Sequence, residues 1–412
     1  MKILMCNKFH FILGGTERYL FDLSRWLKTS GHTVIDFSTR DRRNFYSEYS
    51  EYFIEGSDFS KGLKVHNISE VKKAIKFIYS FPARRNIERL IERYKPDVAH
   101  IHNIYHHISS SIINSLRKKN IPIVMTLHDY KLICPNYSLF TNDGVCERCK
   151  KYNYYNAIIY KCIKKSRLTS ILACLEMYFC KMLKIYENNI DVFIAPSRFM
   201  QNKLVDFGID RKKIFYLPHA INLSLFEPNF EPGEYIVYFG NIYYRKGTHL
   251  LLTVAKQFKH IPIKVIGEGS YKKVLQQQVT EYNLENVELL GYKPVNELIN
   301  IVSKALLVVI PSLWYEVVGL TIYEAFASGK CVVASDIGAI PEIVKDGING
   351  ILFKPGDEQD LLEKIAYLLN NPQKIKELGR NGFEMIRKYN DAVSHYQMLV
   401  DLYNEVINKH KN

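Results

Sequence analysis

The sequence predicts an α/β protein built from two doubly wound parallel sheets that face each other across a cleft. Three observations support this fold class. Short apolar, β-branched segments, typical of strands buried on both faces of a sheet, alternate with amphipathic segments of helical length. The alternation runs through the chain twice, and a proline-rich segment without periodicity, residues 218–233, separates the two rounds. A chain of 412 residues is long enough for two such domains.

The first round fills residues 1–220. Its opening strand leads to a turn at Gly14 and Gly15 and then to a helix over residues 16–28, which has apolar side chains at helical spacing and stops near Gly31. Each later strand is followed by turn residues or by a helix. The expected strands are residues 2–6, 33–38, 98–102, 122–127 and 192–195.

The second round fills residues 221–391 and repeats the same pattern. After it, residues 392–409 alternate apolar and polar side chains at helical spacing, which predicts a C-terminal helix. The expected strands of this round are residues 235–239, 263–266, 287–290, 305–310 and 331–334.

Two glutamates eight positions apart, Glu316 and Glu324, follow the strand at residues 305–310. Residues 320–328 have helical composition, so the loop before them places Glu316 beyond the carboxyl end of a strand, where open α/β sheets bind ligands. Paired carboxylates suit a ligand rich in hydroxyl groups, because each accepts several hydrogen bonds. This favours a sugar nucleotide. The alternative is a solvated loop residue and a glutamate stabilised by the helix dipole.

The segment from Pro311 to Gly350, including the E-x7-E spacing of these glutamates, resembles the retaining GT-B glycosyltransferases of family 4. The resemblance implies two Rossmann-like domains, the second binding a nucleoside diphosphate sugar and the first a hydroxyl acceptor. It also implies that the terminal helix, residues 392–412, packs back on the first domain. The expected reaction is hexosyl transfer with retention, in which Glu324 binds the ribose and Glu316 the transferred sugar.

The leaving diphosphate needs cations or backbone donors to neutralise its charge. Asn241, Arg245 and Lys246 follow a strand and precede a helix. Lys246 matches a family lysine, whereas Asn241 stands where the family usually has an arginine. Either Arg245 supplies the missing charge or Asn241 donates a neutral hydrogen bond. A lysine on the solvated surface is the plainer alternative for this motif.

Backbone N–H groups are expected to bind phosphate at the start of the helix after Glu316, and glycine turns are expected to let the backbone approach the ligand. Ordinary strand-to-helix turns are the alternative reading of these glycines. The residues concerned are Gly14, Gly15, Gly267, Val318, Gly319 and Leu320.

His128 follows a strand and matches a histidine that the family places by the donor sugar. A purely structural histidine is the alternative at such a position. No catalytic metal or other cofactor is expected, because lysine and backbone donors are available for the diphosphate.

Four of the eight cysteines, Cys134, Cys146, Cys149 and Cys162, are clustered in the sequence. A C-x2-C pair with two outlying thiols can form a tetrahedral structural zinc site that would fix the loop after His128. Because the spacing falls short of a double C-x2-C pattern, free thiols remain the alternative.

The positive charge lies in the first half. Residues 1–220 carry 36 Lys and Arg against 20 Asp and Glu, a net charge of +16, while residues 221–412 carry 20 against 22, a net charge of −2. Because no nucleic-acid module is recognisable, the favoured polyanion is an anionic membrane surface or a lipid-linked acceptor. The basic residues 161–167 and the apolar helical segment 168–186 are either a membrane contact or a core helix with a solvated basic end.

No apolar run reaches the roughly 18 residues that span a bilayer, and the amino terminus has no secretory pattern. We therefore expect a cytoplasmic protein, peripheral on the inner face of the membrane, that acts in surface polysaccharide assembly, such as capsule, exopolysaccharide or O-antigen. Two alternatives stay open: a synthase acting on a soluble sugar, and a catalytically silent nucleotide-sugar sensor or scaffold.

Overall fold

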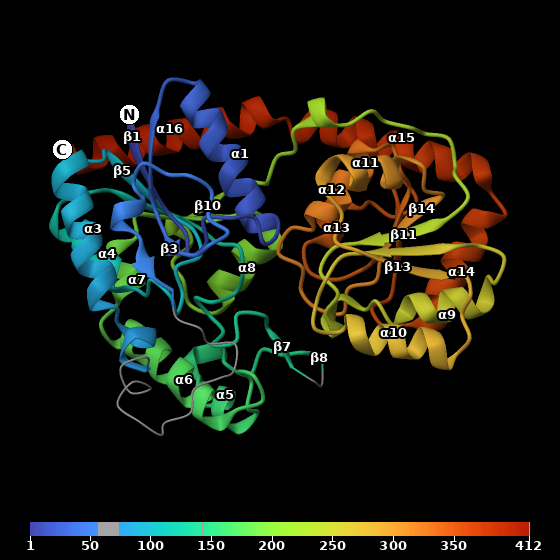
Figure 1. Cartoon of the computed structure of the whole chain (residues 1–412), viewed down its shortest axis with the longest axis horizontal. Coiled ribbons are helices and arrows are strands. Elements are labelled where there is room, and N and C mark those ends of the chain that lie inside the picture. The colour runs from blue at the N-terminus through green and yellow to red at the C-terminus, as the bar shows by residue number, and fades with distance from the viewer. Residues whose placement is uncertain (57–73, 142–143, 412) are drawn as a thin grey trace.

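Two parallel sheets of six strands each form the cores of two domains that stand side by side in Figure 1. The structure, a computed structural model, describes residues 1–56, 74–141 and 144–411. The strand order is β10-β9-β6-β5-β1-β2 in the first sheet and β13-β12-β11-β14-β15-β16 in the second. The α/β class and the two parallel-sheet domains predicted from the sequence are confirmed.

The first sheet has helices on both sides. Strands β5 and β6 are buried at every position, as expected of strands covered on both faces. Its strands are β1 (Lys2–Cys6), β2 (Thr33–Phe37), β5 (Val98–Ile101), β6 (Ile123–Thr126), β9 (Val192–Ala195) and β10 (Ile214–Tyr216). The helices are α1 (Gly15–Thr29), α3 (Phe81–Tyr94), α4 (Ser111–Lys118), α5 (Asn156–Ile159), α6 (Arg167–Met182), α7 (Ile185–Asn189) and α8 (Arg198–Asp206).

Two minor strand pairs belong to the same domain. The pair β3 (Thr39–Arg40) and β4 (Ile54–Glu55) is parallel. The pair β7 (Phe140–Thr141) and β8 (Gly144–Val145) is antiparallel and projects toward the second domain at the bottom of Figure 1.

In the second sheet the central strand β11 pairs with β12 on one side and β14 on the other, so the strand order reverses there and leaves a crevice at the carboxyl ends. The strands are β11 (Ile236–Phe239), β12 (Ile263–Ile266), β13 (Val287–Gly291), β14 (Leu307–Ile310), β15 (Val332–Ser335) and β16 (Ile351–Phe353). The helices are α9 (Leu250–Gln257), α10 (Lys272–Glu281), α11 (Val295–Ser303), α12 (Leu320–Ala327), α13 (Ile340–Ile343), α14 (Glu358–Leu369) and α15 (Pro372–Tyr389).

Every strand predicted from the sequence is present, with ends that differ by at most two residues. The edge strands β10 and β16 were not predicted, because each has three residues and too little sequence to show a pattern. Both extend their sheets by parallel pairing, with β9 and β15 respectively.

The last helix, α16 (Ala392–Lys411), returns to the first domain, where Figure 1 also shows both chain ends. Its buried residues join those of β1 and α1 in one apolar cluster. Tyr403 is fully buried, and its hydroxyl lies 2.6 Å from His100 Nδ1. Asn412, the end of the predicted helix, lies outside the described residues. Within the described part, no helix has the length and apolar run that crossing a bilayer requires.

The chain passes between the domains twice, and the two passages touch each other. Asn390 Nδ2 donates a hydrogen bond of 3.0 Å to the carbonyl of His219. The backbone N–H of Ile221 donates one of 3.2 Å to the carbonyl of Asn390. The second domain is therefore an insertion, and the two linker segments that enter and leave it are hydrogen-bonded to each other.

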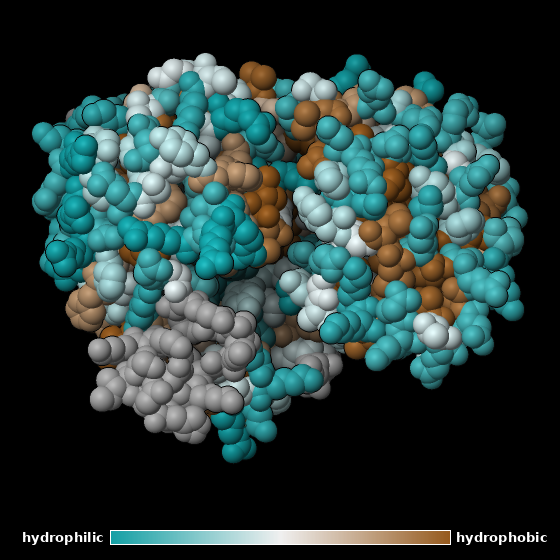
Figure 2. All heavy atoms as spheres, in the orientation of Figure 1, coloured by the Kyte–Doolittle hydropathy of each residue, from teal (hydrophilic) through white to brown (hydrophobic). Residues whose placement is uncertain are grey.

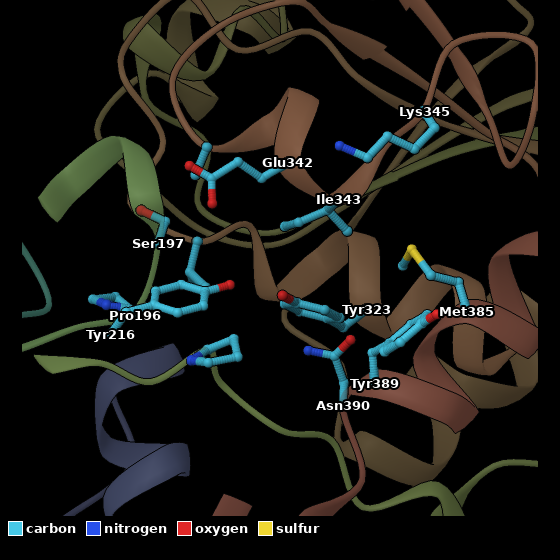
Figure 3. A pocket seen from close by; sticks show the side chains of 13 residues that line it. Pro196, Ser197, Tyr216, Tyr323, Glu342, Ile343, Lys345, Met385, Tyr389 and Asn390 are labelled. Atoms are coloured by element: carbon cyan, nitrogen blue, oxygen red, sulfur yellow. The ribbon is translucent and has the colours of Figure 1, made fainter. Parts of the chain in front are cut away.

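A cavity of about 340 Å³ lies between the domains beside these passages (Figure 3). Figure 3 shows Glu342, from the second domain, pointing toward Ser197 at the start of α8 in the first. The Glu342 carboxylate accepts hydrogen bonds from the backbone N–H groups of Arg198, at 2.8 Å, and Phe199. A side chain of one domain thus caps a helix of the other.

Candidate functional site

A cleft of about 340 Å³ opens where the carboxyl ends of β11, β12 and β14 face the loop after β1. Figure 2 shows the surface hollowed between the two domains. Most site residues predicted from the sequence come together in its lining. These are Gly14, Gly15, His128, Asn241, Lys246, Gly267, Glu316, Val318, Gly319, Leu320 and Glu324.

Glu316 and Lys246 form an ion pair on the second-domain wall of the cleft. Lys246 Nζ donates to Glu316 Oε1 at 2.6 Å, and the Ser312 hydroxyl donates to the same oxygen. Glu316 is only 5% exposed. Burial alone would raise the pKa of Glu316, but Lys246 and Ser312 outweigh it, so the pKa lies below its usual range. Glu316 is therefore a fixed, ionised acceptor.

The helix that carries Glu324 begins at the cleft with free backbone donors. Gly319 is the N-cap of α12, and no side chain caps this end. Its orphan N–H groups and the positive end of the helix dipole can bind an anion. Val318 and Leu320 flank this position in the cleft lining.

Glu324 reaches across the cleft to the first domain. Arg18 of α1 donates to Glu324 Oε1 in a salt bridge, and the two side chains are 31% and 17% exposed. Burial raises the pKa of Glu324, and Arg18 opposes that rise. A ligand hydroxyl that binds Glu324 must share it with Arg18 or displace Arg18.

Two glycines allow the close approaches that shape the cleft. A Cβ on Gly15 would lie 2.8 Å from Leu320 Cδ1, so the first-domain turn packs directly on the start of α12. Gly267 has a φ of +139°, and a Cβ there would lie 1.8 Å from the carbonyl oxygen of Gly240. The two strand-end turns of the second domain therefore touch through bare backbone.

His128 is half-buried on the first-domain wall and lies against the buried His102 and His219. His128 Nε2 lies 2.9 Å from His102 Nδ1, and the two rings stack. Burial, with a smaller contribution from His102, places the pKa of His128 well below its usual value. His128 is therefore a neutral imidazole, held by His102 in one orientation.

Arg245 is the predicted site residue that does not reach the cleft. The short 3-10 helix Tyr244–Lys246 places Lys246 in the cleft lining but not Arg245, whose guanidinium lies 4.7 Å from the Trp314 ring. It lines a neighbouring cavity of about 530 Å³, shared with the segment after β6. Of the two options for the missing family arginine, only Asn241 lines the cleft.

Sequence reasoning missed several cleft residues. Arg18 and His219 line it, and so does Ser312, four residues before Glu316. Ser312 lies inside the glutamate block and Arg18 lies three residues after Gly15, so proximity to a motif was the available signal. His219 lies in the proline-rich segment and gave no such signal.

The four clustered cysteines lie apart from the cleft and line a separate small cavity in the first domain. None of the eight cysteines forms a disulfide.

The cleft itself offers three kinds of chemistry: carboxylates that accept from hydroxyl groups, a lysine and helix N–H groups that attract negative charge, and a neutral histidine opposite them.

Comparison with known families matches both domains. Residues 13–225 match the family described as Glycosyltransferase Family 4, and residues 224–385 match the one described as Glycosyl transferases group 1. An uncharacterized glycosyltransferase of Methanocaldococcus jannaschii, MJ1178, is 27% identical over 94% of each chain. An uncharacterized 42.6 kDa protein in the cps region of Klebsiella pneumoniae is 26% identical over 83% of this chain and 87% of its own.

Solved structures share the architecture. Sucrose-phosphate synthase (tll1590) from Thermosynechococcus elongatus superposes with a TM-score of 0.74 over 99% of this chain and 100% of that one, at 20% identity. Anabaena HepE (Alr3699), in complex with UDP-glucose, gives 0.71 over 98% and 100%, at 18% identity. The arrangement is the GT-B fold that the sequence resemblance implied.

Proposed function

Because the chain belongs to the glycosyltransferases described as Glycosyltransferase Family 4 and Glycosyl transferases group 1, we propose that it moves a hexosyl group from a nucleoside diphosphate sugar to a hydroxyl acceptor with retention of configuration. The observation that carries the proposal is the ion pair between Lys246 and the buried Glu316, set in the cleft beside the uncapped start of α12. Cationic and anionic groups lie together where a ligand with a charged half and a hydroxylated half would bind.

In this proposal the donor diphosphate binds Lys246 and the N–H groups at the start of α12. These groups neutralise the charge that develops on the leaving diphosphate, which is the main demand of the reaction. Asn241 donates a neutral hydrogen bond, and Arg18 brings a second cation from the opposite wall. Because these donors suffice for the leaving group, the transfer needs no metal cofactor.

The two glutamates bind the two hydroxylated parts of the donor. Glu316, fixed by Lys246 and Ser312, accepts from hydroxyls of the transferred sugar. Glu324, about one turn into α12, accepts from the ribose. The neutral His128 faces the sugar from the first domain and donates or accepts one hydrogen bond there. The acceptor attacks on the face that the diphosphate leaves, and a phosphate oxygen receives its proton.

We assign the acceptor to the basic first domain and to an anionic membrane surface. Helix α6 exposes an apolar stripe at helical spacing, with Met182 75% and Leu175 50% exposed. Exposed lysines precede the helix and provide the complementary charge. The stripe is Ile171, Leu175, Tyr178 and Met182, and the basic residues are Lys161, Lys164, Lys165 and Arg167. This supports a lipid-linked or polysaccharide acceptor in surface polysaccharide assembly.

Donor turnover tests the proposed activity. The full chain is incubated with UDP-, GDP- and ADP-sugars in EDTA, starting with UDP-glucose because HepE is bound to it, and nucleoside diphosphate release is followed. Release that depends on Lys246 supports a transferase. Donor binding, seen as a rise in melting temperature, without any turnover would instead favour the sensor. The anomeric configuration of the product, read by NMR, tests retention.

Vesicle sedimentation tests the membrane assignment. The protein should pellet with vesicles that contain anionic lipid, less so as salt is raised, and not with neutral vesicles. Replacing Leu175 and Met182 by serine should weaken binding while leaving donor hydrolysis unchanged. If the protein does not bind vesicles and transfers sugar to a free soluble sugar as fast as to a lipid-linked acceptor, the soluble-sugar synthase is favoured instead.

A further inference from the structure

Four thiols from separate segments of the first domain line one small cavity, which we call the cysteine cavity. Cys134 lies in the loop after β6, Cys146 and Cys149 follow β8, and Cys162 follows α5. The cavity measures about 10 Å³, at the lower limit of what can hold one water molecule. The cysteines at positions 6, 174, 180 and 331 do not line it.

This set of side chains has the chemistry of a structural zinc site. Thiolate sulfur is the preferred ligand of zinc, four ligands complete its tetrahedron, and a C-x2-C pair is a usual half of such a site. Among the residues that the structure describes, no three His, Cys, Asp or Glu side chains are gathered closely enough to hold an ion as they stand. Zinc binding by these four thiols would therefore require them to turn toward the cavity centre.

One of the two residues between the paired cysteines, Glu147, links the cysteine cavity to the loop that carries Glu316. Glu147 accepts a hydrogen bond of 3.0 Å from the Tyr315 hydroxyl and forms a salt bridge of 2.5 Å with Lys203. Tyr315 immediately precedes Glu316 in the second domain, whereas Lys203 belongs to α8 of the first. The Tyr315 ring also packs against Phe199, with centroids 4.8 Å apart.

We propose that the cysteine cavity binds one Zn²⁺ and that this ion positions Glu147 as a contact between the domains. Zinc would join Cys146 to Cys149, so the turn that carries Glu147 would be fixed at both ends. Glu147 would then hold Tyr315, and with it the loop that presents Glu316 to the donor. Each thiol that binds loses its proton to solvent, so binding weakens as the pH falls.

Metal content tests the site without any assay of activity. Full-length protein purified without chelators should contain about one zinc per chain, measured by atomic emission, and Cys149→Ser should lose it. Cys180→Ser is the matched control, because Cys180 is equally buried, lies 3.5 Å from the Ser110 hydroxyl and is outside the cavity. Protein that takes up no zinc when Zn²⁺ is supplied, or a Cys149→Ser variant that keeps it, would overturn the site.

The positioning role rests on the proposed function, so it is tested separately. Tyr315→Phe should keep its zinc and raise the donor KM a few-fold with little change in kcat. Cys149→Ser should raise the KM by a similar factor, and the double variant should add nothing further, because both changes break the same connection. Fully additive effects would refute the connection while leaving the site intact.

Where Cys149→Ser fails to fold, slow removal of zinc from the wild-type protein replaces it. Chelator-treated protein should show the raised KM, and added Zn²⁺ should restore the original value. The same treatment should have no effect on Tyr315→Phe. An unchanged donor KM in zinc-free wild-type protein counts against the positioning role. Absence of any turnover in zinc-loaded wild-type protein counts against the proposed function.

Discussion

Replacing Lys246 by alanine is the sharpest test of the proposed chemistry, because Lys246 has two roles. It pairs with the buried Glu316 at 2.6 Å and would bind the leaving diphosphate. Loss of one preorganised donor of this kind costs about 10²–10³ in kcat, or about 2.7–4 kcal/mol of barrier. The free energy of unfolding should also fall by about 1–3 kcal/mol, since Glu316 loses a charged hydrogen bond.

The pH dependence of the variant adds a second readout. With Lys246 gone, burial of Glu316 is opposed mainly by the Ser312 hydroxyl, so the pKa of Glu316 rises. Activity that needs an ionised Glu316 should then be lost at a higher pH than in the wild type. The assay is the initial rate of nucleoside diphosphate release at saturating donor, measured from acid to neutral pH.

Lys273→Ala is the matched control, because Lys273 is an exposed lysine on α10 outside the cleft. It should leave both rate and pH profile unchanged. A Lys246→Ala enzyme with wild-type kcat and an unshifted acid limb would show that the pair is structural only, and the mechanism above would have to be abandoned.

Three further predictions concern stability and metal dependence. Gly267→Ala should lower the free energy of unfolding, measured by urea titration, by more than about 2 kcal/mol, because the added Cβ would overlap the Gly240 carbonyl oxygen. Gly56→Ala is the control and should leave this free energy unchanged, since a Cβ there would have no contact under 3.7 Å. Burial lowers the pKa of His100 to about 3 and of His395 to about 4, so the unfolded chain binds more protons below pH 6.5. Stability should be constant above that pH and fall below it, by on the order of 1–2 kcal/mol for each histidine at pH 5, and equal stability at pH 5 and 7.5 would contradict this. EDTA should leave the initial rate unchanged over minutes, and a fast loss reversed by magnesium would contradict the metal-free transfer.

The sheets were predictable because their strands are buried on both faces and therefore appear as short apolar runs. Residues 192–195 and 263–266 were predicted with the bounds that the structure gives them. Local motifs were predictable for the same reason. Glu316 and Lys246 lie in the loops that follow such runs, six and seven residues after the strand ends, so their place at the carboxyl edge of the sheet follows from the sequence.

Contacts between distant segments were not predictable. The partners of Glu324, Glu316 and Glu342 lie 306, 70 and 144 residues away, and nothing in one segment specifies the other. Arg245 shows a second limit. Adjacent residues in a 3-10 helix point in different directions, so a cationic pair in the sequence placed only Lys246 in the cleft.

The hydrogen bonds between the two interdomain passages, at His219 and Asn390, restrict how the halves can move. Two separate linkers would let one domain twist and slide against the other. Because these two linkers are hydrogen-bonded together, they act as one hinge, and the main motion left is bending about one axis. Each closure of the domains would then bring Glu342 back to the start of α8 and Leu320 back into contact with Gly15. Alignment of the reactants would thus be rebuilt identically in every cycle, without any ligand having to enforce it.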